Sequence, residues 1–163
     1  VFSYRTPPNL PLSQGEGFLC LFITNKHGII VRNMPESQTA APAKTILIAE
    51  DDRFLLKTLT LKLKKAGYNI ISAVDGEEAL VKYKEGKANL MLLDLVMPKK
   101  SGFEVLKEIN KDGGKKLMPI MVLSNLGQES DIEQVKTLGV DTYLIKANYT
   151  LQQIVDEVKK QIA

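Results

Sequence analysis

Short apolar runs alternate with amphipathic segments from Lys44 to the end of the chain. The runs have the length of buried strands, and the segments between them place apolar residues at the spacing of one helix face. The five expected strands are 45–49, 69–73, 90–93, 119–123 and 142–145. The helices expected after them lie at 54–63, 76–85, 103–110, 132–138 and 151–162. In the first of these helices, the apolar residues at helical spacing are Phe54, Leu55, Leu59 and Leu63.

This alternation predicts a parallel sheet covered by helices on both faces, because crossovers between parallel strands are right-handed and need the length of a helix. Five strand–helix units favour an open sheet over a closed barrel, which needs about eight units. We therefore expect an α/β fold with a doubly wound five-stranded parallel sheet.

Residues 1–43 follow a different pattern. They hold five of the seven prolines and show no sustained helical or alternating period. Ser37 to Ala43 has the small-residue and proline composition of a linker. Leu21 and Ile23 suggest a short strand, but the sequence shows no partner for it. We expect residues 1–43 to be a poorly ordered extension and linker, and residues 44–163 to be a separate domain.

The composition narrows the classes of function. The formal net charge is +3, so charge gives no argument for nucleic acid or an acidic membrane surface. Cys20 and His27 are the only cysteine and histidine, which disfavours a disulfide, a thiolate zinc site and histidine catalysis. The longest apolar run near the start, Phe18 to Ile23, is far below the roughly 20 residues that span a bilayer. We expect a cytoplasmic protein that contacts neither nucleic acid nor membrane directly.

Polar side chains follow four of the five expected strands. The carboxyl ends of parallel strands meet at one edge of the sheet, and ligands of open α/β sheets bind at that edge. The residues expected there are Glu50, Asp51 and Asp52 after the first strand, Asp94 after the third, Ser124 at the end of the fourth and Lys146 after the fifth.

This set of side chains suits phosphoryl chemistry. Clustered carboxylates repel unless a cation compensates, and Mg²⁺ prefers oxygen ligands. A carboxylate such as Asp94 can attack phosphorus and form an aspartyl phosphate. Lys146 could pair with Asp94 and then with a phosphoryl oxygen, to which Ser124 could donate a hydrogen bond. Taken singly, Asp51 or Asp52 could be a helix cap and the others turn or surface residues, but their coincidence at four strand ends favours one site.

The chain from Lys44 to Ala163 resembles the receiver domains of bacterial two-component response regulators. The resemblance rests on segments in the family's order and spacing, namely 46–52, Asp75-Gly76-Glu77-Glu78-Ala79-Leu80, 92–98, 101–104, 119–124 and 143–146. It implies a flavodoxin-like fold that accepts a phosphoryl group from a sensor histidine kinase or phosphotransfer protein and then switches protein–protein interactions. Because no further module follows Ala163, we expect a single-domain regulator that acts on an unidentified output protein.

The resemblance also assigns the metal site and the acceptor. Asp94 would be the phosphoacceptor. Asp51 and Asp94 would bind Mg²⁺ directly, Glu50 would act through water, and the backbone carbonyl of Val96 would complete the protein ligands.

The resemblance further implies a switch. Lys146 would contact the phosphoryl group, Ser124 would move toward it, and Tyr143 would turn inward as Ser124 moves. The chain departs from the family at Ala147, where a proline, often after a cis bond, is usual. A cis bond before a residue other than proline costs about 2.5–4 kcal/mol, so we expect a trans bond here.

A second departure concerns the lifetime of the phosphorylated state. Val96 and Leu126 are apolar at the two positions that, in members that lose phosphate rapidly, help to position the hydrolytic water. Asn125 stands where a small residue is common. We expect a comparatively long-lived phosphorylated form.

Two other functions stay open. A scaffold that works without phosphorylation would use the same fold, although the set of Asp51, Asp94, Ser124 and Lys146 argues against it. A phosphatase with the same aspartyl chemistry would need a second acid two residues after Asp94, where Val96 stands. We therefore expect a stoichiometric acceptor rather than an enzyme with turnover.

Overall fold

The computed structural model describes residues 21–25, 28–32, 43–111 and 116–162. The chain separates into two units, Val1–Ala41 and Pro42–Ala163. In the first unit, β1 (Leu21–Asn25) pairs antiparallel with β2 (Gly28–Arg32). The expectation that β1 has no partner is therefore wrong, because the β-branched run within β2 is typical of a strand. The poor order expected for the rest of 1–43 concerns residues outside the described ones.

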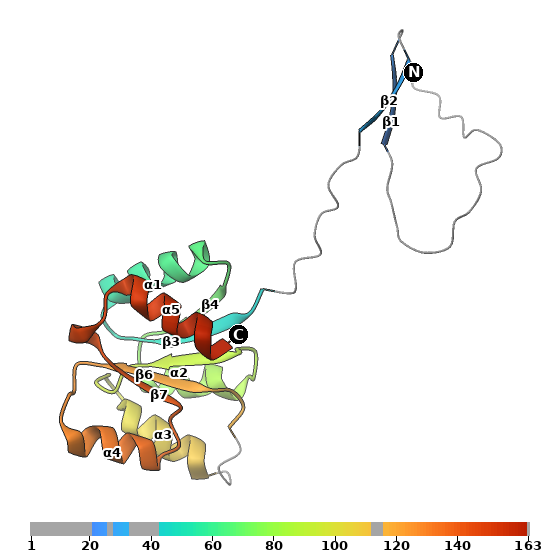
Figure 1. The fold of residues 1–163 in the computed structure, drawn as a ribbon. Helices are drawn as coiled ribbons and strands as arrows, with labels where there is room; N and C mark the ends of the chain where they lie inside the picture. Colours follow the sequence, from blue (N-terminus) through green and yellow to red (C-terminus); the bar gives the residue numbers. More distant parts are fainter. Residues whose placement is uncertain (1–20, 26–27, 33–42, 112–115, 163) are drawn as a thin grey trace. The chain divides into compact units, whose positions relative to one another are not determined.

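The second unit contains every strand and helix expected from the sequence (Figure 1). Its strands are β3 (Thr45–Ala49), β4 (Asn69–Ala73), β5 (Leu90–Leu93), β6 (Ile120–Ser124) and β7 (Thr142–Ile145). Its helices are α1 (Arg53–Lys65), α2 (Gly76–Lys84), α3 (Gly102–Lys111), α4 (Glu129–Thr137) and α5 (Leu151–Ile162), with a 3-10 turn η1 (Lys146–Asn148) before α5.

The five strands form one parallel sheet in the order β4-β3-β5-β6-β7. Successive residues of a strand point to opposite faces of the sheet. Ile46 and Ile48 therefore pack in one core layer with α1 and α5, whereas Leu47 and Ala49 pack in the other with α2, α3 and α4. This arrangement confirms the doubly wound α/β fold.

One expected core position is wrong. The sequence pattern placed Phe54 on the buried face of α1, but its side chain is 81% exposed. Leu56, Leu59 and Leu63 are the buried residues of this helix. Their spacing of three and then four residues keeps them on one side, and Phe54, two residues before Leu56, falls on another side.

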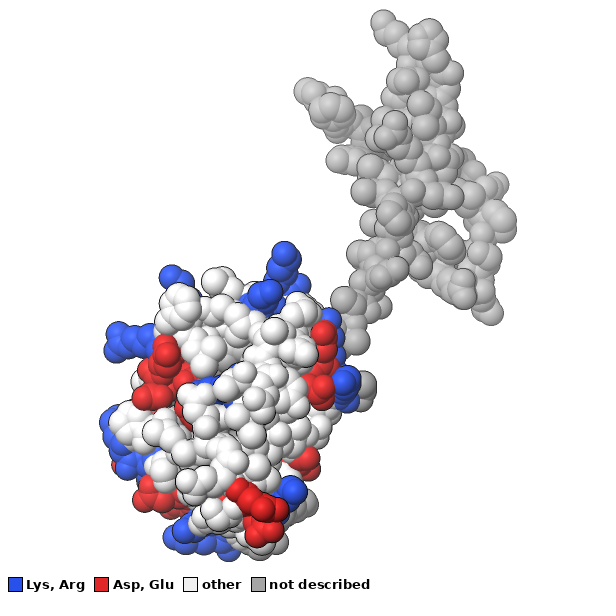
Figure 2. Space-filling model, turned by 60° about the vertical axis from the view of Figure 1, so that its left-hand side comes forward, with Lys and Arg blue, Asp and Glu red and all other residues white. Residues whose placement is uncertain are grey.

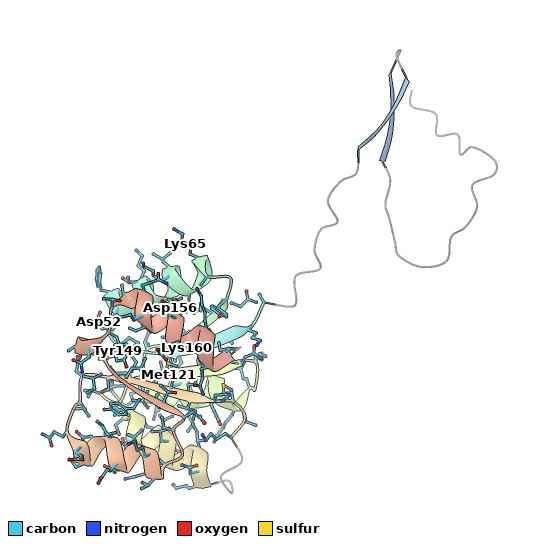
Figure 3. The ribbon with its side chains drawn as sticks, viewed as in Figure 1. Asp52, Lys65, Met121, Tyr149, Asp156 and Lys160 are labelled. Carbon is cyan, nitrogen blue, oxygen red and sulfur yellow. The ribbon has the colours of Figure 1, made fainter. Side chains whose placement is uncertain are left out.

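Asp52 caps helix α1. Its side chain accepts hydrogen bonds from the backbone N–H groups of Phe54, at 2.8 Å, and Leu55, at 3.1 Å. Figure 3 labels Asp52 near the start of α1 and Lys65 at its end. Of the two acids that could cap the helix, Asp52 is thus the one that does, and Asp51 takes no part in the cap.

None of the helices in the described part of the chain has the length and apolar content of a membrane span.

Two glycines allow helices to approach the segment after β5 very closely. A Cβ atom on Gly102 would lie 2.3 Å from the carbonyl oxygen of Asp94, and the Gly102 N–H donates to the Leu95 carbonyl at 2.9 Å. A Cβ atom on Gly76 would lie 2.0 Å from the carbonyl oxygen of Lys100. The starts of α2 and α3 therefore hold the backbone that follows β5 from two sides.

We expect Gly102→Ala to lower the free energy of unfolding by about 2 kcal/mol, because the added methyl group meets backbone atoms that cannot move cheaply. Urea unfolding followed by circular dichroism measures the change. Gly127→Ala is the control, since its Cβ would make an ordinary contact with Ile145 at 3.5 Å. Equal stability of the two variants would contradict the close packing at Gly102.

Candidate functional site

The centre of the sheet is where the strand order changes direction. From β3 the chain passes to β4 on one side of the sheet, and then to β5 on the other side. Ligands of open α/β sheets bind beyond the carboxyl ends of strands at such a point. Glu50 and Asp51 directly follow β3, and Asp94 directly follows β5. Backbone hydrogen bonds of 3.0 Å from Glu50 to Ala73 and from Asp94 to Ala49 continue the sheet and fix where these residues begin.

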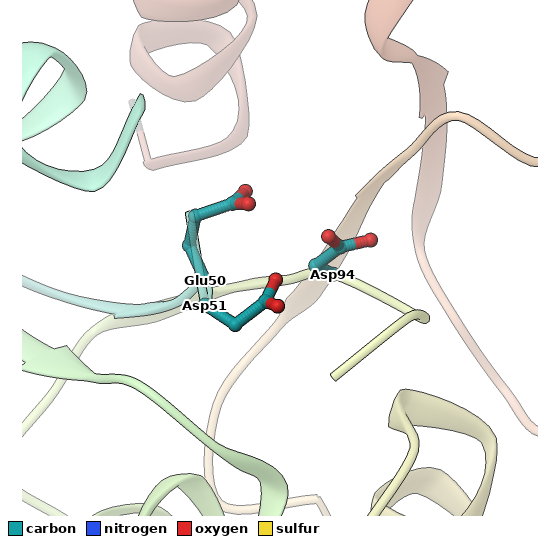
Figure 4. A group of neighbouring side chains, drawn as sticks. All are labelled: Glu50, Asp51 and Asp94. Carbon is teal, nitrogen blue, oxygen red and sulfur yellow. The ribbon is translucent and has the colours of Figure 1, made fainter. Parts of the chain in front are cut away.

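Three carboxyl groups converge at this edge of the sheet. One oxygen each of Glu50, Asp51 and Asp94 lies within 4.8 Å of the others. Figure 4 shows them at the ends of their two neighbouring strands. Glu50 and Asp94 are buried, whereas Asp51 is exposed. The cluster is therefore open to solvent on the side of Asp51.

Lys146 brings one positive charge to the cluster. Its Nζ atom lies 2.7 Å from Asp94 Oδ2 and 2.7 Å from Glu50 Oε2. The contact with Asp94 was expected, but the contact with Glu50 was not. The only feature of the sequence that points to a contact of Glu50 with a basic residue is its place directly after the apolar run 45–49, where a carboxylate needs a partner.

The charges of this cluster do not balance. The pKa of the Glu50 carboxyl is raised to about 7, chiefly because the group is buried; the hydrogen bond and charge of Lys146 lower this pKa, and the charge of Asp94 adds to the rise. Burial lowers the pKa of Lys146, but its bonds to Asp94 and Glu50 outweigh this, so its pKa is raised. Three carboxyl groups beside one ammonium group are what a divalent cation would stabilise.

The donor set fits Mg²⁺, which takes one or two carboxylates and keeps several waters. Asp94 Oδ1 accepts the N–H groups of Leu95, at 2.6 Å, and Val96, at 3.3 Å. These bonds hold the backbone of Val96 beside the acids. Among the described residues, none donates a hydrogen bond to the Val96 carbonyl oxygen, so no such bond competes with its use as a metal ligand.

Ser124 and Tyr143 both bond to the backbone of Leu126, in the loop between β6 and α4. The Ser124 side chain is buried, and its Oγ accepts the Leu126 N–H at 3.3 Å. The Tyr143 hydroxyl donates to the Leu126 carbonyl at 2.6 Å. Burial raises the pKa of Tyr143, which keeps the hydroxyl protonated as a donor. A movement of Ser124 would therefore be felt by Tyr143 through Leu126.

The segment after Lys146 follows a course without a cis bond. No cis peptide occurs among the described residues, which confirms the expectation for Ala147. Residues Lys146–Asn148 form the turn η1, closed by a 3.4 Å hydrogen bond from the Tyr149 N–H to the Lys146 carbonyl.

Two residues near the site were not singled out from the sequence. Asp75 is buried, and its Oδ2 lies 2.6 Å from Lys99 Nζ, on the loop that carries Val96. The aspartate before Gly76 has the signature of a helix cap. Nothing in the sequence indicates its partner, because the two residues are far apart along the chain.

Comparisons with known proteins agree with this geometry. A family model described as the response regulator receiver domain matches residues 46–159. Response regulator RR06 of Streptococcus pneumoniae is 42% identical over 117 residues, which are 72% of this chain and 52% of RR06. The chain spans about half the length of the curated relatives it matches.

Solved structures of similar fold include proteins with Mg²⁺. A CheX-CheY-BeF3-Mg complex from Borrelia burgdorferi has 30% identity and a TM-score of 0.64, and the match covers 72% of this chain and 87% of that one. TrrA from Thermotoga maritima, in complex with Mg²⁺ and BeF, has 31% identity and a TM-score of 0.62, with 72% and 98% covered. The fold, the strand order and the match over 46–159 show that this chain belongs to the response regulator receiver domain family.

Proposed function

We propose that this receiver domain accepts a phosphoryl group on Asp94. The observation that carries the proposal is the setting of this carboxylate, which is buried next to a second acid pair, with Oδ2 on Lys146 and Oδ1 on two backbone N–H groups. These contacts hold the carboxylate in one orientation, with the Lys146 ammonium group placed to take over a phosphoryl oxygen.

The donor we propose is a phosphohistidine of a sensor kinase or phosphotransfer protein. An oxygen of the Asp94 carboxylate attacks phosphorus, and the phosphorus–nitrogen bond breaks as the oxygen–phosphorus bond forms. The imidazole nitrogen of the donor keeps the electron pair of that bond and takes up a proton. The product is an acyl phosphate on Asp94, and each chain takes up one phosphoryl group. The chain therefore acts as a stoichiometric acceptor rather than as an enzyme with turnover.

Asp51, Asp94 and the Val96 carbonyl would hold the Mg²⁺ ion directly, and Glu50 would hold it through water. When bound, the ion supplies the positive charge that neutralises the carboxylates and the incoming phosphoryl oxygens. Lys146 neutralises the side of Asp94 that faces Glu50. With the ion bound, the positive charges of Mg²⁺ and Lys146 would balance the three carboxylates, so a dianionic group would no longer meet an excess of negative charge.

The switch that we propose is electrostatic. A phosphoryl group adds a charge of about −1.5 to −2 and three acceptor oxygens. Ser124 can turn its hydroxyl from the Leu126 N–H toward one of these oxygens, in a charge-assisted hydrogen bond. Because Tyr143 is bonded to the carbonyl of the same residue, we propose that Leu126 and the loop before α4 move with Ser124. We propose the face from Gln128 to Tyr143 as the surface that an output protein reads.

A protein partner fits the charge distribution. On the face shown in Figure 2, basic and acidic side chains are interspersed. From the family and the nearly balanced composition we propose a cytoplasmic protein that contacts neither nucleic acid nor membrane directly. Action on a separate output protein stays a prediction. The complete set of site residues favours a phosphorylated switch over a scaffold.

We expect the parent protein, incubated with Mg²⁺ and acetyl phosphate, to gain the mass of one phosphoryl group. Asp94→Asn should gain none, because an amide oxygen is a poor nucleophile. Intact-protein mass spectrometry reads both. A phosphorylated Asp94→Asn protein, or a folded parent that binds Mg²⁺ yet gains no mass from either acetyl phosphate or a phosphorylated kinase, would contradict the proposal.

Asp51→Asn should weaken Mg²⁺ binding by about tenfold or more, since it removes a charged oxygen ligand. Isothermal calorimetry measures the affinity. Asp52→Asn is the matched control, because asparagine remains a good helix cap and Asp52 lies outside the carboxyl cluster. The assignment of the metal ligands fails if both variants bind Mg²⁺ as the parent does.

The phosphorylated protein should be long-lived, because Val96 and Leu126 offer no polar group that could orient an attacking water. Val96→Asn should shorten its lifetime, and its side chain is exposed enough to be replaced without disturbing the core. Mass spectra taken at intervals after removal of acetyl phosphate give the rate. Leu117→Asn, an exposed position before the start of β6, is the control. Rapid loss of phosphate from the parent would show that the prediction is wrong.

A further inference from the structure

The loop between β5 and α3 contains a strained turn. The Lys100 N–H donates to the Pro98 carbonyl at 2.8 Å, which closes a turn of three residues around Lys99. Lys99 has φ of 63° and is the only residue other than glycine with positive φ among the described residues. This conformation is costly for a lysine and persists where the surroundings enforce it. The turn therefore needs a stabilising contact.

Asp75 supplies this contact from the start of helix α2. Its Oδ1 accepts the Glu78 N–H at 2.8 Å and caps the helix, and its Oδ2 lies 2.6 Å from Lys99 Nζ. The carboxylate is 7% exposed, whereas the Lys99 side chain is 58% exposed. The helix cap and the lysine, in that order, lower the pKa of Asp75, so the carboxylate is charged at neutral pH. One side chain thus joins the start of α2 to the turn.

The backbone adds a second link between the same two segments. The Gly76 N–H donates to the Pro98 carbonyl at 3.4 Å, and Gly76 packs directly against the Lys100 carbonyl. On the other side of the turn, Lys100 Nζ lies 2.9 Å from Glu108 Oε2 of α3. The two consecutive lysines therefore tie the loop to two different helices.

A simpler explanation is that Lys99 is an ordinary surface lysine that meets Asp75 by proximity. Exposed ion pairs often contribute little to stability. Three features favour a specific role: the carboxylate is buried, the lysine occupies a conformation better suited to glycine or asparagine, and the turn begins two residues after Val96. A lysine retained at such a position indicates that its ammonium group is used.

We propose that the Asp75–Lys99 ion pair positions the loop that carries the Val96 carbonyl, and so sets the affinity of the acidic cluster for Mg²⁺. The inference rests on the proposed function. Neither residue touches the reacting atoms. Both act through the backbone of the turn, which the pair holds in its strained conformation against the start of α2.

Lys99→Met and Asp75→Asn test the pair. Each should weaken Mg²⁺ binding about fivefold, and the double variant should bind no more weakly than either single variant, because the two residues act as one unit. Asparagine retains the cap of α2, so the start of the helix is preserved. Lys99→Arg should restore most of the affinity. Lys82→Met, which removes the Lys82–Glu78 ion pair of α2, is the matched control and should bind as the parent does.

A second measurement is independent of the metal. Amide hydrogen exchange followed by NMR in the absence of Mg²⁺ should be faster for residues 96–102 in Lys99→Met and Asp75→Asn, and unchanged in α1 and β6. Lys99→Gly separates the ion pair from the strain, since glycine accepts positive φ without cost. If the ion pair offsets the strain, this variant should loosen the loop less than Lys99→Met does.

The outcomes distinguish this inference from the proposed function. A parent that binds no Mg²⁺ or accepts no phosphoryl group overturns the proposed function, and the exchange rates then decide whether the pair holds the loop. Mg²⁺ affinity equal to that of the parent in folded Lys99→Met and Asp75→Asn overturns the inference. So do exchange rates for residues 96–102 that equal those of the parent in both Lys99→Met and Asp75→Asn.

Discussion

The contact of Lys146 with Glu50 and Asp94 joins three strands of the sheet at one point. Its ammonium group lies 2.7 Å from each carboxylate, in a place where both acids are buried. Without it, two carboxylates would sit side by side with little water to solvate them, which is unfavourable. The orientation of the acceptor carboxylate depends on this ion pair, which also links the residue after β7 to those after β3 and β5.

The site combines a rigid support with an unbalanced charge. Gly102 and Gly76 bring the starts of α3 and α2 into direct contact with the backbone after β5, so the residues that follow Asp94 have little freedom. The carboxyl groups outnumber the single ammonium group, and burial raises the pKa of Glu50 to about 7. A rigid site with excess negative charge favours the binding of a cation. The charge of a bound cation would in turn favour the approach of a phosphoryl group.

The route from the acceptor to the outer surface is short. Ser124, at the end of β6, accepts the N–H of Leu126, and Tyr143, within β7, donates to the carbonyl of the same residue. A change in the bonding of Ser124 can therefore reach an aromatic side chain of the next strand through the backbone of a single residue. This arrangement needs no large movement of the sheet, whose buried core would resist one.

The sequence by itself determined the α/β class, the five strands and helices, and the set of residues at the strand ends, because apolar periodicity and strand order place polar groups at one edge. It misplaced Phe54 and missed the partner of β1. It also could not show the bond of Lys146 to Glu50 or the pairing of Asp75 with Lys99. These contacts join residues distant in the chain, and only the tertiary packing of helices on the sheet decides which side chains meet.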